Sequence, residues 1–235
     1  MASLVTYAVE DGAVRIGMDD GKLNVLSPQM LAELHESFER AAGEGVPVVL
    51  RGHGKAMSAG FDLKVLTGGG TEAADLLRAG FELSERILSF PTPVVIACPG
   101  HAIAMGLFLV LSGDYRIGAS GPFRLTANEV AIGMTLPRTA MEICRYRLLP
   151  SWFDRTVALA DVFTPETALS AGILDQVVDP AALDAAVDEA IGKLAALNLR
   201  AHKETKLRAR EAVLAKIRQS IEDDDAEFRA AIAAR

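Results

Sequence analysis

The chain has 235 residues, of which 50% are hydrophobic, so it can bury a sizeable core in one large or two small domains. The formal net charge of -7, without any run dense in Lys and Arg, argues against non-specific binding to nucleic acid. The first twenty residues show neither a secretory nor a transit-peptide pattern, so no targeting segment is expected.

The first half of the chain alternates strand and helix signals. In chain order the predicted elements are a hairpin at 4–18, a helix from 28 to about 41, a buried strand at 46–50, a glycine-punctuated loop at 51–63 and a helix from 71 to about 89. Asp11 and Gly12 mark the hairpin turn, whereas Ser27 and Pro28 mark the N-cap and first residue of the first helix.

The uncharged stretch at 87–113 is long enough to suggest a membrane span, but its prolines break it. We therefore expect no membrane segment there. The predicted elements of the second half are a strand at 94–98, a tight turn, a short buried helix at 104–113, strands at 114–119 and 122–126, helices at 137–149, 151–160 and 164–172, a strand at 173–178 and a helical tail from 180. Ser151 and Thr164 are the expected caps of two of these helices, and Gly172 is an expected stop.

The pattern indicates an α/β fold, but not a dinucleotide-binding one. After the strand at 46–50, Gly52 and Gly54 are not followed by a third glycine at the required place. Cys98 and Cys144 lie in apolar surroundings without C-x-x-C spacing, which predicts reduced, buried thiols and a cytoplasmic location. No metal site is expected, because none of the histidines has ligand spacing; they are His35, His53, His101 and His202.

Two loops, 56–63 and 100–108, share one pattern: a strand, a glycine-containing bend and an apolar helix start. The first N–H groups of a helix have no partner within the helix and lie at the positive end of its dipole. Two such donors aimed at one point would form an oxyanion hole. The pattern alone is common, so the loops by themselves only suggest this chemistry.

Further segments accompany these loops in a fixed order. They are KLNVLS (22–27), GKAMSAGFDLK (54–64), PTPVVIACPGHAIAMG (91–106), GDYRI (113–117), NEVAIGM (128–134) and AGILDQVV (171–178). In this order and spacing the sequence resembles the crotonase, or enoyl-CoA hydratase/isomerase, family over most of its length.

This resemblance implies a crotonase-like ββα spiral core and an acyl-CoA thioester as ligand. It places the acyl-CoA-binding core at 1–195 and a helical trimerisation segment at 196–235. The expected assembly is a homotrimer or a hexamer built as a dimer of trimers, without nucleic acid or membrane partners. No separate cofactor is expected, because coenzyme A is part of the substrate.

The resemblance also implies the site residues. Two backbone N–H groups hold the thioester oxygen in this family, and they fall on Phe61 and Met105; since backbone groups act, we expect the side chains there to be loosely constrained. Family hydratases use two glutamates, whose positions fall here on Phe108 and Glu129. Phenylalanine cannot transfer a proton, and its ring tends to exclude water.

An apolar residue at the first position and a glutamate at the second resembles the 3,2-enoyl-CoA isomerase branch. There one glutamate takes a proton from C2 of a 3-enoyl-CoA and returns it at C4, so Glu129 is the expected acid and base. Burial among Val130, Ile132 and Met134 is expected to raise its pKa. The expected substrate-binding residues are Lys22, Ala59, Gly60, Lys64, Gly106 and Phe108.

Three other residues carry weaker signals. Ser58 and His101 could form a nucleophile and base, but there is no G-x-S-x-G elbow and no third, orienting residue. Asp62 is expected to cap or orient its loop.

Two other functions stay open on the sequence. One is an enoyl-CoA hydratase that activates water with Glu129 and an unrecognised group, and the other is a non-catalytic acyl-CoA-binding protein.

Overall fold

Most of the predicted elements are present in the computed structural model of the chain, which describes residues 2–234. The strands are β1 (Val5–Glu10), β2 (Ala13–Met18), β3 (Val48–Arg51), β4 (Ala56–Ser58), β5 (Val94–Cys98), β6 (His101–Ile103), β7 (Tyr115–Ala119), β8 (Leu125–Thr126) and β9 (Gln176–Val178). The helices are α1 (Pro28–Glu44), α2 (Leu63–Gly68), α3 (Gly70–Ser89), α4 (Met105–Ser112), α5 (Arg138–Arg147), α6 (Pro150–Val157), α7 (Pro165–Ala171), α8 (Leu183–Ala195) and α9 (Leu199–Ala233), with single 3-10 turns η1 (Val130–Ile132) and η2 (Pro180–Ala182).

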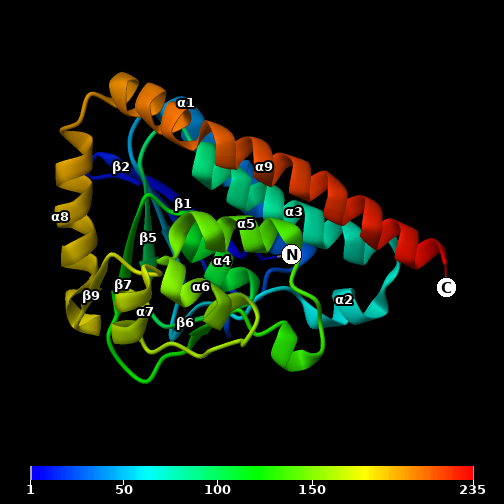
Figure 1. The fold of residues 1–235 in the computed structure, drawn as a ribbon. Helices are drawn as coiled ribbons and strands as arrows, with labels where there is room; N and C mark the ends of the chain where they lie inside the picture. The colour runs from blue at the N-terminus through cyan, green and yellow to red at the C-terminus, as the bar shows by residue number, and fades with distance from the viewer. Residues whose placement is uncertain (1, 235) are drawn as a thin grey trace.

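The larger sheet has six strands in the order β1-β2-β3-β5-β7-β9. The predicted hairpin forms its antiparallel edge, and every other pair is parallel. Side chains alternate between its faces, as the period of two requires. Val48 and Leu50 pack with α1, α3 and α4 on one face, whereas Val49 packs with α8 on the other. Figure 1 shows α8 on the side of the sheet opposite to α3 and α9.

A second, smaller sheet includes two strands, β4 and β6, in segments that we expected to be a loop and a turn, and a third, β8, in the strand predicted at 122–126. It has three parallel strands in the order β4-β6-β8. The expectation of irregular structure at 51–63 was therefore wrong for β4, as was that of a simple turn before α4. Strands of two or three residues are too short to show a period, and their pairing comes only from tertiary contacts. The short helix α2 begins at Leu63, where the pattern of 56–63 predicted the start of a helix.

The helix caps follow the sequence closely. Ser27 caps α1 through the N–H of Met30, and Thr164 forms a capping box at α7, which Gly172 ends in a left-handed conformation. The predicted cap at Ser151 was wrong, because α6 begins one residue earlier at Pro150. Proline at the first helical position has its φ already set and needs no partner for an N–H.

The long C-terminal helix α9 packs along its own chain, beside α3 and α5 (Figure 1). Leu214, Ile217 and Ile221 belong to the same buried cluster as α3 and α4. The predicted boundary between 195 and 196 and the predicted role of the tail in trimerisation remain predictions. Within residues 2–234, no helix combines the length and the apolar character needed to cross a bilayer.

Three buried charges fix α9 to the sheet. Lys206 Nζ lies 2.6 Å from Asp114 Oδ2, and Arg210 lies 2.7 Å from Asp114 Oδ1. Burial lowers the pKa of Lys206 to about 8, although Asp114 opposes this shift. Burial alone would raise the pKa of Asp114, but the two cations outweigh it and lower the value. Each buried charge therefore depends on its charged partners to offset the loss of its hydration.

Candidate active site

The small sheet brings the candidate residues to one edge. Ser58 on β4 pairs with Ala102 on β6, and Ile103 on β6 pairs with Thr126 on β8. Phe61, Met105 and Glu129 each follow the carboxyl end of one of these parallel strands within three residues. Because the strands are parallel neighbours, their carboxyl ends meet at the same edge, where ligands of α/β proteins commonly bind.

An isolated bridge to the segment before α1 fixes the backbone on both sides of Phe61. Leu26 donates its N–H to the Gly60 carbonyl (2.9 Å), and Asp62 donates its N–H to the Leu26 carbonyl (3.2 Å). Because Phe61 lies between these bonded residues, its own N–H points away from Leu26. Phe61 precedes Asp62, the N-cap of α2, so our expectation that this donor begins a helix was wrong. Asp62 caps its loop, as predicted.

The Met105 N–H does begin a helix. Met105 is the first residue of α4, and Ala104 before it has a φ of 50°, which is strained for a residue with a Cβ. Leu107 and Phe108 both donate to the Ala104 carbonyl, so the earlier N–H of Met105 has no acceptor within the helix. The two predicted donors therefore differ in kind, one extended and one helical.

Glycines allow the two donor segments to approach closely. A Cβ on Gly60 would stand 3.0 Å from the Ile103 carbonyl oxygen and 3.6 Å from the Met105 nitrogen. A Cβ on Gly106 would collide with the Ser58 carbonyl. Ala59, also predicted to bind substrate, is half-buried and donates its N–H to Leu23. The binding roles of these residues remain predictions.

Glu129 is a buried carboxyl group with an unsatisfied oxygen. Its side chain is 8% exposed, and Oε2 has no hydrogen-bond partner among residues 2–234. Burial raises its pKa to about 7, against which only a bond to its own backbone acts. The direction of the predicted shift is confirmed, but Val130 and Ile132 do not cause it, because they are 44% and 54% exposed.

The predicted position of the second glutamate is filled by a buried aromatic cluster. Phe108 stacks on Phe81 of α3 with ring centroids 6.2 Å apart, and Phe81 meets Phe61 edge to face at the same distance. The side chain at this position therefore offers no group that can donate or accept a proton. The side chains of Phe61 and Met105 are both buried, which contradicts our expectation that they are loosely constrained.

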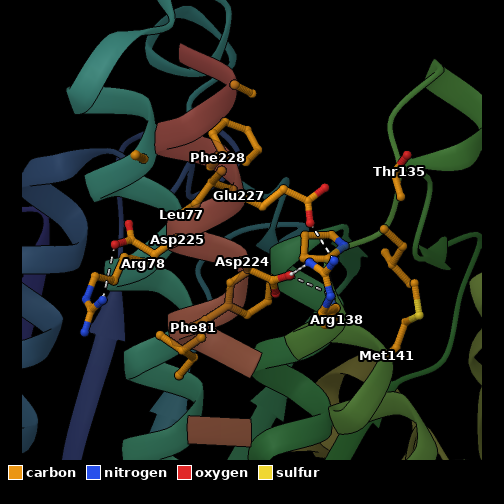
Figure 2. Close-up of a pocket in the computed structure, with 15 residues that line it drawn as sticks. Leu77, Arg78, Phe81, Thr135, Arg138, Met141, Asp224, Asp225, Glu227 and Phe228 are labelled. Carbon is orange, nitrogen blue, oxygen red and sulfur yellow. Dashed lines mark hydrogen bonds and ion pairs between the residues drawn. The ribbon is translucent and has the colours of Figure 1, made fainter. Parts of the chain in front are cut away.

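A cavity of about 370 Å³ opens beyond this cluster, between α3, α9 and the start of α5. Figure 2 shows Phe81, Leu77 and Phe228 on one side, and Met141 and Thr135 opposite them. Its walls are mainly apolar, with charged groups from Arg78, Arg138 and Asp224 among them. Phe81 is shared by the cavity and the aromatic cluster, whereas Glu129 is not among the residues that line the cavity.

The other candidates have local structural partners. Ser58 donates to the Asn24 carbonyl (2.6 Å), and His101 accepts the Arg124 N–H at 3.0 Å, so neither is arranged as a nucleophile or base. His35 lies 2.9 Å from the Ala79 carbonyl. Lys22 and Lys64 are exposed, in segments that flank the bridge to Phe61. Both cysteines are free and buried, as predicted.

Comparison with known proteins identifies the family. A family model described as enoyl-CoA hydratase/isomerase matches residues 9–232. The chain belongs to this family. The predicted α/β fold class, with a crotonase-like ββα core and a long C-terminal helix, is thereby confirmed.

Solved enoyl-CoA hydratase/isomerase structures resemble the chain over nearly its whole length. An enoyl-CoA hydratase from Mycobacterium marinum is 49% identical, with a TM-score of 0.91, over 96% of this chain and 99% of that chain. A Mycobacterium tuberculosis protein, described as an enoyl-CoA isomerase in one structure and as a probable enoyl-CoA hydratase in another, is 45% identical in the first, with a TM-score of 0.92, over 97% of this chain and 100% of that chain.

Curated relatives are more distant. A probable enoyl-CoA hydratase from Bacillus subtilis is 32% identical over 134 residues, which make up 55% of this chain and 52% of the relative. The chain spans about half the length of the first curated relatives that it matches.

For this enoyl-CoA hydratase/isomerase family member, sequence reasoning missed two parts of the site. Phe81 and its neighbour Gly80 lie inside the helix predicted from 71 to about 89, and neither was expected to contribute to the site. The sequence did contain a signal for Gly80. A glycine inside an amphipathic helix lowers the stability of the helix relative to alanine, so its presence indicates a close contact at that position. No group of metal-ligating side chains lies within the described residues.

Proposed function

We propose that this chain is an enoyl-CoA isomerase that converts a 3-enoyl-CoA into a 2-enoyl-CoA. The observation that carries the proposal is the meeting of Phe61, Met105 and Glu129 at one edge of the small sheet. Two backbone donors and one buried carboxyl group at the same edge suit the removal of a proton next to a thioester carbonyl.

In the proposed reaction Glu129 acts as both base and acid. Its carboxylate takes a proton from C2, and the electrons of that C–H bond move to the thioester oxygen, giving an enolate. The N–H groups of Phe61 and Met105 stabilise the charge on that oxygen. The protonated Glu129 then returns the proton at C4, the double bond settles between C2 and C3, and no atom is gained or lost. A pKa of about 7 suits a group that must both accept and donate.

Phe108 favours isomerisation over hydration. Hydration needs a second polar group to hold water, and the buried Phe81–Phe108 stack offers none. The names of the relatives support both activities: the M. marinum relative is described as a hydratase, and the M. tuberculosis relative as an isomerase in one structure and as a probable hydratase in another. Hydratase activity is therefore the second candidate function.

The acyl-CoA substrate accounts for the remaining candidate residues. Lys22 and Lys64 are placed at the surface, where their charges would meet the phosphates of coenzyme A. The apolar cavity beside Phe81 offers room for the acyl chain. We further propose a homotrimer or hexamer in the cytoplasm, with no cofactor beyond the coenzyme A of the substrate.

Substitution of the single carboxyl group tests the proposal. In Glu129→Gln, kcat for a 3-enoyl-CoA should fall by about 10²–10⁴-fold, because the general acid and base is lost. The measurement is the appearance of the conjugated thioester by ultraviolet absorbance. Glu72→Gln, an exposed change on α3, is the matched control and should leave turnover unchanged.

Two results would contradict the assignment. Turnover by Glu129→Gln at the rate of the wild type would remove Glu129 from the mechanism. Efficient hydration of crotonyl-CoA by the wild type would favour the second candidate function and overturn the argument from Phe108.

A further inference from the structure

The side chains of the two proposed donors converge on one glycine. Gly80 lies in the interior of α3 and is buried. A Cβ built on it would stand 2.5 Å from Cζ of Phe61 and 3.5 Å from Cγ of Met105. The first distance is far below van der Waals contact, so the Phe61 ring rests directly on the helix backbone at this position, with Met105 beside it.

The Phe61 ring has little room to move elsewhere. It is 9% exposed and meets Phe81, the next residue of α3, edge to face at 6.2 Å. Its backbone is fixed on the other side by the bridge to Leu26. A ring held at its far end by Gly80 and at its near end by this bridge has its N–H direction set by both contacts.

The contact with the Phe61 ring explains why a glycine occupies this helix position. Inside a helix it is unfavourable relative to alanine, because it loses more conformational freedom on folding. Gly80 has no left-handed φ to explain it. By contrast a Cβ on Gly192, inside α8, would meet nothing within 4 Å, so this glycine can accept a methyl group freely.

We propose that Gly80 is a positioning residue, which seats the side chains of Phe61 and Met105 so that their backbone N–H groups converge on the thioester oxygen. The inference rests on the proposed function and adds to it a residue that touches neither substrate nor the reacting atoms. It also explains why two residues that act through their backbones have buried side chains.

The test is Gly80→Ala, with Gly192→Ala as the matched control. We expect kcat of Gly80→Ala to fall about tenfold, a fraction of the 10²–10³ lost when a whole oxyanion donor is removed, with KM within about twofold of the wild type. Gly192→Ala should keep the kcat and KM of the wild type. A kcat of Gly80→Ala equal to that of the wild type would overturn the inference.

A double variant shows whether the effect passes through the Phe61 ring. Leucine at 61 keeps the backbone N–H but lacks the ring atoms that meet Gly80. In the Phe61→Leu background, Gly80→Ala should therefore change kcat less than twofold, by the non-additivity expected of groups in contact. An undiminished tenfold effect would overturn the inference. If Gly80→Ala fails to fold, Phe61→Leu alone tests the inference. Its kcat must then be lower than that of the wild type.

A spectroscopic probe separates this inference from the proposed function. The carbonyl stretch of hexanoyl-CoA labelled with ¹³C at C1 should shift to lower frequency when bound to the wild type, and shift less in Gly80→Ala at unchanged Kd. No shift in the wild type would contradict the proposed oxyanion hole itself. A full shift in the wild type and the same shift in Gly80→Ala would leave that function standing and overturn the role of Gly80.

Discussion

Glu129 is a carboxyl group whose burial works against its own charge. Its folded-state pKa of about 7 lies above the ordinary value of 4.5, so the folded protein binds a proton there more tightly than the unfolded chain does. The stability that this proton gives is complete below pH 4.5 and is lost as the pH rises to about 7. A group that weakens the fold at neutral pH is consistent with a role in chemistry.

Glu129→Gln should therefore change stability in a pH-dependent way. Because the amide does not ionise, the variant should be more stable than the wild type at pH 8, by up to about 3 kcal/mol, and lack this advantage at pH 4.5. Urea unfolding of both proteins at the two pH values measures the difference. A stability difference that is the same at both would show that Glu129 titrates normally.

At the scale of elements, α9 completes the N-terminus of α5. Pro137 provides no side-chain cap there, but Asp224 of α9 accepts the N–H groups of Arg138 (3.1 Å) and Thr139 (2.9 Å). Its carboxylate also lies 3.1 Å from the Arg138 guanidinium. A dashed line in Figure 2 marks this interaction. The segment that joins η1 to α5 is thus tied to the C-terminal helix at its α5 end, through Arg138 and Thr139.

Asp224→Ala should lower the free energy of unfolding by about 1–2 kcal/mol, as loss of a helix cap does. Asp223→Ala is the control, because the Asp223 carboxylate is exposed and, among the described residues, accepts a hydrogen bond only from Gln219 on its own helix. The midpoint of urea unfolding compares the two. Equal losses would mean that the contact with α5 contributes nothing.

Elements that depend on neighbouring residues could be predicted from the sequence, whereas elements that depend on distant partners could not. The hairpin, the cap of α1 and the capping box of α7 depend on neighbouring residues, and the sequence predicted all three. The strands β4 and β6 depend on each other across some forty residues, and the cap of α5 comes from a residue 86 positions away. Such long-range partners leave no periodic or local signal.

The same division holds for the candidate site. Family resemblance located Phe61, Met105 and Glu129, and the buried carboxyl group has the predicted direction of pKa shift. The resemblance did not reveal the close approach of the Phe61 ring to Gly80, because contact between the two residues exists only after α3 folds back over the small sheet. Nor did it locate the cavity, whose walls come from three separate helices.

At the scale of the whole molecule, the buried charges on Asp114, Lys206 and Arg210 join the last helix to the central sheet. Asp114 also accepts the Val94 N–H at 2.8 Å, so one carboxylate serves both the sheet and α9. Removing it would leave two buried cations without a counter-charge.

Asp114→Asn should therefore cost about 3–5 kcal/mol of stability, which for a chain of this size lowers Tm by roughly 6–20 °C. Asp75→Asn, which removes an exposed partner of Arg229, is the control and should cost at most about 1 kcal/mol. Calorimetry on the three proteins measures both effects. A similar Tm for the two variants would refute the idea that burial makes the first carboxylate matter more.

The cap that Asp224 supplies also sets an order of events during synthesis. The α5 N-terminus is translated 86 residues before the carboxylate that completes it. At the usual ~5–20 residues per second, the ribosome needs on the order of ten seconds to cover that distance. Throughout that interval the segment between Glu129 and α5 lacks its anchor, so a nascent chain completes this part of the candidate site only when the last helix is made.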